Sequence, residues 1–246
     1  MLKLTKRFRQ FYRGEDIVVE RIYTDGVWHD TTENVPNAVI NNQISNQAVV
    51  LGNGPTRLDF NLNLIANHRG GLYGSRRLQT YGCNALYRDF TPDFLIAVGN
   101  RGIIQEIAES DYPTDNIVYT NSIHMLEHPN KFYLIPHDPY ADAGTTAAYI
   151  AAFDGHKNIY LLGFDTQDTP GHNYNIYAGT SNYDAQTDTV SDLRWRMNFR
   201  NLAMTYTDVD FAIVHEKNNY PLPDAWKDLL NVRAISHNTF VLETDL

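Results

Sequence analysis

A short apolar run that ends in two glycines constrains the fold more than any other feature of the chain. Residues 48–51 (AVVL) are wholly apolar, and Gly52-Asn53-Gly54-Pro55-Thr56 follows at once. An unbroken apolar run of this length is typical of a strand buried on both faces of a parallel sheet. Glycines at its end let a ligand approach the backbone, and free N–H groups there can receive a phosphate. The segment therefore predicts a nucleotide-binding turn.

Similar strand-like segments recur along the chain, with helix-like segments between some of them. The predicted strands are 48–51, 78–81, 94–98, 116–119, 132–135, 159–162 and 211–214, and the predicted helices are 101–110, 145–154 and 190–206. Strands that alternate with helices indicate an α/β fold, here a Rossmann-like, doubly wound and mostly parallel sheet. We expect one such domain over residues 47–246.

Residues 1–46 differ in character and predict an N-terminal extension. Residues 16–23 are rich in β-branched residues, Thr24-Asp25-Gly26 supplies a turn, and residues 27–29 start a return strand, which together predict a β-hairpin. Residues 31–47 are polar and are interpreted as a loop or linker. The first thirteen residues carry five cationic side chains and are interpreted as a solvated basic arm, with an anchor for an acidic partner as the alternative. These side chains are Lys3, Lys6, Arg7, Arg9 and Arg13.

Charge and cysteine usage exclude several classes of protein. The net charge of −9 argues against a protein that wraps nucleic acid with its whole surface. No stretch approaches the roughly 20 apolar residues of a membrane helix, and the N-terminus lacks the pattern of a secretory leader. The single cysteine, Cys83, excludes an intramolecular disulfide and a thiolate zinc site. A cytoplasmic location is the resulting expectation.

A second glycine-containing segment lies in the middle of the chain. Small residues at 143–148 open a predicted helix, which ends at Gly155. The strand at 159–162 follows and ends in Gly163-Phe164-Asp165. Open α/β sheets bind ligands just beyond the carboxyl ends of their strands, which is where Asp165 is expected.

Three blocks of the sequence resemble the bacterial lipooligosaccharide sialyltransferases and the related motility-accessory-factor glycosyltransferases. They are Gly52-Asn53-Gly54-Pro55-Thr56 with its strand, the pair Cys83-Asn84, and the small-residue helix that leads to Gly163-Phe164-Asp165. The resemblance covers about residues 48–180. It implies a Rossmann-like domain that binds a cytidine-monophosphate sugar without a required metal and transfers the sugar to an acceptor hydroxyl.

The resemblance also implies which residues form the site. Those expected to hold the nucleotide sugar are Gly52, Asn53, Gly54, Asn84, Asn100, Gly144, Thr145, Gly163, Phe164 and Asp165. Tyr174 and Tyr177 match the tyrosines that stabilise the departing phosphate, a role that suits a phenol hydroxyl. The chain departs from the family at Ala143, where the family has Ser, and at the general base. The family's His is absent after Tyr177, and His172 is the nearest substitute. Related enzymes are often oligomers.

Two other functions remain open. One is a binding or structural protein that keeps the nucleotide-sugar fold without catalysis, because fold alone does not carry function. The other is an enzyme similar to the archaeal pterin diphosphokinases, which share a Gly-rich turn and a Gly-x-Asp of this kind. That reading would use Mg²⁺ on Asp165 and Asp168, a possibility that the sequence does not favour.

Overall fold

The structure is a computed structural model that describes residues 2–10, 15–36, 45–68, 78–165, 175–185, 192–216 and 221–246. Its main part is a parallel sheet with the strand order β11-β10-β9-β4-β5-β6-β7-β8. The strands are β4 (Gln47–Leu51), β5 (Gln79–Cys83), β6 (Phe94–Ile96), β7 (Ile117–Thr120), β8 (Tyr133–Leu134), β9 (Asn158–Leu162), β10 (Asp210–His215) and β11 (Val232–Ser236). The Rossmann-like fold class predicted from the sequence is confirmed.

The order of the strands reverses at β4. From β4 the chain moves outward through β5, β6, β7 and β8, and it then returns to the other side of β4 with β9, β10 and β11. In open α/β sheets such a reversal leaves a crevice at the carboxyl ends of the two central strands. The reversal therefore lies between β4 and β9, the strands that carry the two glycine-containing turns.

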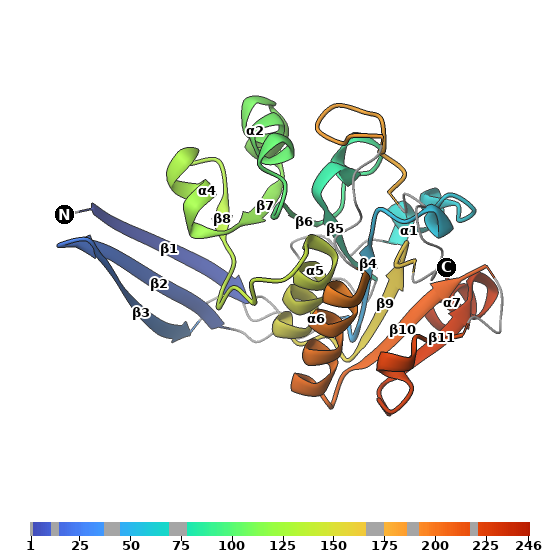
Figure 1. Ribbon diagram of the computed structural model, residues 1–246. Helices are drawn as coiled ribbons and strands as arrows, with labels where there is room; N and C mark the ends of the chain where they lie inside the picture. Colours follow the sequence, from blue (N-terminus) through green and yellow to red (C-terminus); the bar gives the residue numbers. More distant parts are fainter. Residues whose placement is uncertain are drawn as a thin grey trace.

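Helices cover both faces of this sheet (Figure 1). They are α1 (Leu62–His68), α2 (Arg101–Glu109), α3 (Tyr112–Asp115), α4 (Ser122–Glu127), α5 (Ala143–Asp154), α6 (Asp192–Thr205) and α7 (His237–Thr244). Phe199 of α6 packs against Phe211, which is paired with Ile159 in the neighbouring strand. Phe240 of α7 packs against Tyr160, the next residue along β9. Because successive side chains of a strand point to opposite faces, α6 and α7 lie on opposite sides of the sheet.

The N-terminal extension is a three-stranded antiparallel sheet of β1 (Leu2–Gln10), β2 (Glu15–Thr24) and β3 (Val27–Pro36). Asp25 and Gly26, both at positive φ, form the turn between β2 and β3, as the predicted hairpin requires. The sheet extends away from the main sheet, and β1 contacts β8 (Figure 1).

One prediction for the extension was wrong in part, and another is now more specific. The residues 2–10 that were interpreted as a solvated basic arm form a strand, whose backbone pairs with β2 over its whole length. Residues 31–36 are not a linker but the second half of β3. The alternation of charged and apolar residues, which resembled a solvated terminus, suits a strand with exposed positions equally well.

No helix in the described ranges is both long enough and apolar enough to cross a membrane.

Candidate functional site

The turns after β4 and β9 lie side by side at the reversal of the strand order. The Gly52 amide donates to the carbonyl oxygen of Leu162 at 2.8 Å, and the Gly54 amide donates to that of Gly163 at 2.9 Å. These two N–H groups are therefore not free to bind a phosphate, contrary to the expectation from the sequence. They extend the hydrogen bonding between β4 and β9 by one step beyond the strands.

Glycine is required in this turn because the two strand ends approach so closely. A Cβ atom on Gly52 would lie 2.4 Å from the carbonyl oxygen of Gly163. A Cβ atom on Gly54 would lie 1.8 Å from Oδ2 of Asp165. Gly163 itself has a φ of +80°, which a side chain would strain. The glycines are thus explained by contact between the two turns.

Asp165 joins the two turns through one of its carboxylate oxygens. Its Oδ2 accepts hydrogen bonds from the Thr56 hydroxyl at 3.0 Å and from the Thr56 amide at 3.3 Å. The residue is 8% exposed, and no residue in the described part of the chain donates to its buried Oδ1. Burial raises the pKa of this carboxyl, while the bonds from Thr56 act to lower it. Asp165 therefore presents a buried acceptor with unused capacity.

The N-terminus of α5 reaches the same edge of the sheet. Asp142 caps this helix, and its carboxylate accepts from both the amide and the hydroxyl of Thr145 at 2.9 and 2.8 Å. A Cβ atom on Gly144 would lie 3.1 Å from the ring of Phe164. Phe164 is buried and also contacts Trp195. Gly144 thus makes room for Phe164, and the Thr145 amide is occupied by the cap.

The predicted asparagines follow β4, β5 and β6, but two of them bind backbone. Asn53 lies beside Cys83, whose Sγ is 3.8 Å from Oδ1 of Asn53. Asn84, at a φ of 48°, accepts from the Val98 amide at 3.1 Å. Asn100 caps α2, with its Oδ1 accepting from the Ile103 amide at 3.1 Å. Their side chains therefore also have structural roles in the loops that follow β5 and β6.

Tyr177 is held next to this edge, with its hydroxyl already bonded. The backbone amide of the preceding residue, Ile176, donates to the carbonyl oxygen of Asn53 at 2.9 Å. The Tyr177 hydroxyl donates to Oδ2 of Asp89 at 2.5 Å and accepts from Nη2 of Arg57 at 2.9 Å. Burial, followed by the bond to Asp89, raises the pKa of this phenol.

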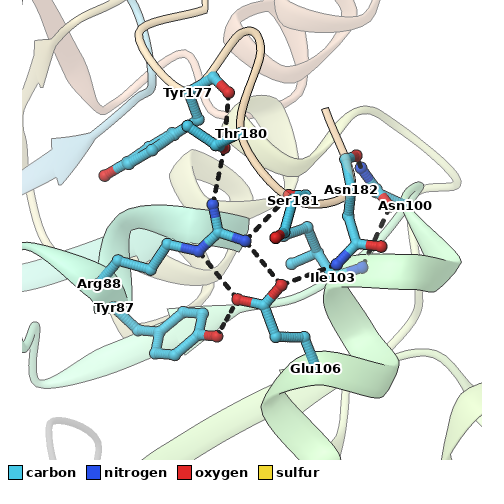
Figure 2. A network of polar contacts seen from close by, with 9 residues as sticks. All are labelled: Tyr87, Arg88, Asn100, Ile103, Glu106, Tyr177, Thr180, Ser181 and Asn182. Atoms are coloured by element: carbon cyan, nitrogen blue, oxygen red, sulfur yellow. Dashed lines mark hydrogen bonds and ion pairs between the residues drawn. The ribbon is translucent and has the colours of Figure 1, made fainter. Parts of the chain in front are cut away.

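A polar network fastens the segment after Tyr177 to α2 and to the 3-10 helix Asn84–Arg88 (Figure 2). Arg88 makes a bidentate pair with Glu106 of α2, at 2.8 Å from Nε and 2.6 Å from Nη2. Burial acts to raise the pKa of Glu106, but its hydrogen bonds lower it on balance. The bonds that fix the segment run from Arg88 to Thr180 Oγ1 and the Ser181 carbonyl, from Asn182 to Glu106, and from Asn100 to the Asn182 carbonyl.

The structure brings most of the predicted residues to one edge of the sheet. The turns at 52–54 and 163–165 are in direct contact, Gly144 touches Phe164, and Tyr177 follows a residue bonded to Asn53. His172 and Tyr174 lie outside the described residues, as does Asp168. Among the residues that the structure does describe, no group of three or more His, Cys, Asp or Glu side chains is placed to hold a metal ion.

Sequence reasoning missed Arg57 and Asp89, the two charged partners of Tyr177. Arg57 comes directly after the glycine turn, and its side chain is 2% exposed. Asp89 follows the 3-10 helix Asn84–Arg88, one turn beyond β5. A cation so close to a strand-end turn is a signal that could have pointed to Arg57.

The fold is that of a Rossmann-like α/β protein, and the two glycine-containing turns meet at the reversal of its strand order, which is where open α/β sheets generally bind ligands. Comparisons with protein-family models, with curated proteins and with solved structures found no match to the chain.

Proposed function

We propose that the protein is glycosyltransferase-like and binds a nucleotide-activated sugar of the cytidine-monophosphate type at the carboxyl ends of β4 and β9. In this proposal the sugar is transferred to an acceptor hydroxyl. The observation that carries it is the buried Oδ1 of Asp165, which lacks a donor among the described residues at the reversal of the strand order. A ribose hydroxyl or a base amino group would supply that donor.

The resemblance in sequence supports the same ligand. The Gly-Asn-Gly turn, Cys83-Asn84 and Gly163-Phe164-Asp165 occur in the order of the sialyltransferase-like family, and all three follow neighbouring strands. Buried polar groups that lack a partner cost about 1–3 kcal/mol each, so an unused acceptor at this position favours a ligand that completes it.

In the catalytic part of the proposal, Tyr174 and Tyr177 stabilise the departing phosphate and His172 is the general base.

A second candidate function, binding without catalysis, is favoured by one specific contact. The Tyr177 hydroxyl is engaged by both Asp89 and Arg57, so it can reach a phosphate only if these bonds rearrange.

Thermal unfolding in the presence of nucleotides tests the proposal. Cytidine monophosphate without metal should raise the unfolding temperature. At a ligand concentration one hundred times Kd, binding adds about 2.7 kcal/mol to the free energy of unfolding. Stabilisation only by a triphosphate with Mg²⁺ would instead indicate a diphosphokinase-like enzyme. If the protein binds a cytidine-monophosphate sugar but neither hydrolyses it nor transfers the sugar, the non-catalytic alternative is supported. The absence of a shift with cytidine, uridine and guanosine nucleotides would contradict the proposal.

A matched pair of variants locates the binding to the turn. Asn53→Asp places a negative charge beside the expected phosphate and should weaken nucleotide binding. Asn63→Asp makes the same chemical change on the exposed surface of α1 and should leave binding unchanged. Equal affinities of the two variants would remove the turn from the site.

A further inference from the structure

Arg57 is a buried cation whose donors are incompletely used. Its side chain is 2% exposed. Nη2 donates to the Tyr177 hydroxyl at 2.9 Å and lies 3.5 Å from Oδ2 of Asp89, which is long for a charged pair. Nη1 is buried and meets no acceptor among the described residues. A guanidinium carries five N–H donors, and burying it without full pairing is costly.

The position of this cation relates it to the glycine turn. Arg57 directly follows Thr56, which binds Asp165. An unused donor, Nη1 of Arg57, and an unused acceptor, Oδ1 of Asp165, therefore flank the same turn. Arg57 also lies against the turn after β9, because its Cβ is 3.2 Å from the position that a Cβ atom on Gly163 would take. Its positive charge opposes the effect of burial, which raises the pKa of the Cys83 thiol to about 12.

We propose that the Arg57 guanidinium binds a phosphate group of the ligand, with its unused Nη1 as one donor, and that the Asp89 carboxylate, now 3.5 Å from Nη2, competes for the same guanidinium while no ligand is bound. The proposal deepens the function given above and rests on it for the identity of the phosphate-bearing ligand. Guanidinium groups match phosphate oxygens in charge and in the planar arrangement of their donors.

Asp89 is suited to leave when an anion arrives. Its side chain is 50% exposed, whereas that of Arg57 is buried, so the carboxylate can turn to water without losing its solvation. The Tyr177 hydroxyl, which donates to Asp89, would then be free to donate to the phosphate oxygen instead. This exchange reconciles the present bonds of Tyr177 with a role on the departing phosphate.

The test uses the full chain and inorganic pyrophosphate as the probe, in a buffer without phosphate or sulfate. Binding is measured by titration calorimetry for the wild type, Arg57→Gln, Asp89→Asn and the control Arg101→Gln. Arg101 is 76% exposed on α2. We expect Arg57→Gln to weaken binding at least about tenfold and Asp89→Asn to strengthen it several-fold, because a competing anion is removed. Arg101→Gln should bind as the wild type does.

Weaker pyrophosphate binding in Arg57→Gln together with stronger binding in Asp89→Asn would identify an anion site. If Arg57 and Asp89 form only a structural ion pair, Asp89→Asn would not bind pyrophosphate more tightly. Wild-type affinity in Arg57→Gln, or no pyrophosphate binding by the wild type, would overturn the proposal. If Arg57→Gln does not fold, Asp89→Asn decides alone, and an unchanged or lower affinity counts against the proposal.

Cytidine and cytidine monophosphate distinguish this proposal from the proposed function. If the monophosphate binds better than the nucleoside in the wild type, and equally in Arg57→Gln, both proposals hold. If the preference persists in Arg57→Gln, the nucleotide site stands and the role of Arg57 is refuted. If pyrophosphate binds through Arg57 but no nucleotide binds, the anion site stands and the nucleotide-sugar function is refuted.

Discussion

Thr56 and Asp165 join the two halves of the sheet at the point where the strand order reverses. The Thr56 hydroxyl and amide both donate to the same carboxylate oxygen of Asp165, at 3.0 and 3.3 Å. This leaves the second oxygen buried without a donor from the described residues. Asp165 thus fastens the turn after β4 to the turn after β9 through a single carboxylate oxygen.

The contact between these turns predicts a steep cost for a methyl group at Gly54. A Cβ atom there would lie 1.8 Å from Asp165 Oδ2 and 2.6 Å from the Gly163 carbonyl oxygen. We expect Gly54→Ala to lower the free energy of unfolding by about 3 kcal/mol or to prevent folding. Gly144→Ala is the comparison, because its closest contacts are at 3.1 Å and alanine favours a helix by about 1 kcal/mol. Chemical denaturation measures both, and equal stabilities would contradict the prediction.

The sheet was predictable from the sequence because its strands are buried on both faces. Each segment between residues 48 and 214 that was predicted as a strand corresponds to one, and the three predicted helices are α2, α5 and α6. The strand β11 was missed because Arg233 interrupts its apolar run. In the structure Arg233 pairs with Asp210 and Glu243, which a single sequence does not reveal.

The site was less predictable, because hydrogen-bond partners far apart in sequence decide what each residue does. Gly52 and Gly54 were interpreted as making room for a phosphate, whereas the atoms they make room for belong to Gly163 and Asp165. The position of Arg57 after the glycine turn was visible in the sequence, but its burial was not, because arginine side chains are mostly exposed and the neighbours in the chain do not reveal an exception.

The raised pKa of Asp165 predicts a specific dependence of stability on pH. Burial makes the folded state hold this proton more tightly than the unfolded chain does. Protonation therefore stabilises the fold, and this stabilisation is lost as pH rises from the unfolded value through the folded pKa. We expect Asp165→Asn, which stays neutral, to be more stable than the wild type at pH 7, with a difference that shrinks toward pH 4. Denaturation of both proteins across this range measures it, and a difference that grows toward acid would contradict the assignment.

The bidentate pair of Arg88 and Glu106 should control the order of the segment that follows Tyr177. Glu106→Gln removes the negative charge and one of the two acceptor oxygens that bind Arg88. We expect the free energy of unfolding to fall by about 1–2 kcal/mol. The amides of residues 177–183 should then exchange faster with deuterium. Glu109→Gln, which changes a residue outside the network at the end of the same helix, should alter neither quantity. Unchanged exchange in Glu106→Gln would show that other contacts hold the segment.

A buried histidine at the opposite end of the sheet should make the fold sensitive to acid. Nε2 of His156 lies 3.0 Å from the Tyr81 hydroxyl, and Nδ1 lies 2.8 Å from the Ser45 carbonyl oxygen. The side chain is fully buried, and this burial lowers its pKa from 6.5 to about 4, although the bond to Ser45 acts in the other direction. Between these pH values His156 is protonated in the unfolded chain but not in the folded state.

The stability contributed by neutral His156 is therefore complete above pH 6.5 and declines as the pH falls toward 4. At about 1.4 kcal/mol per pH unit, the loss reaches about 3 kcal/mol. His156→Gln cannot titrate, so its free energy of unfolding should fall less steeply than that of the wild type across this window. His29→Gln, at an exposed position in β3, should keep the wild-type slope. If the slopes of the wild type and His156→Gln coincide, the folded state binds a proton at His156 as readily as the unfolded chain does, and the buried, neutral arrangement is wrong.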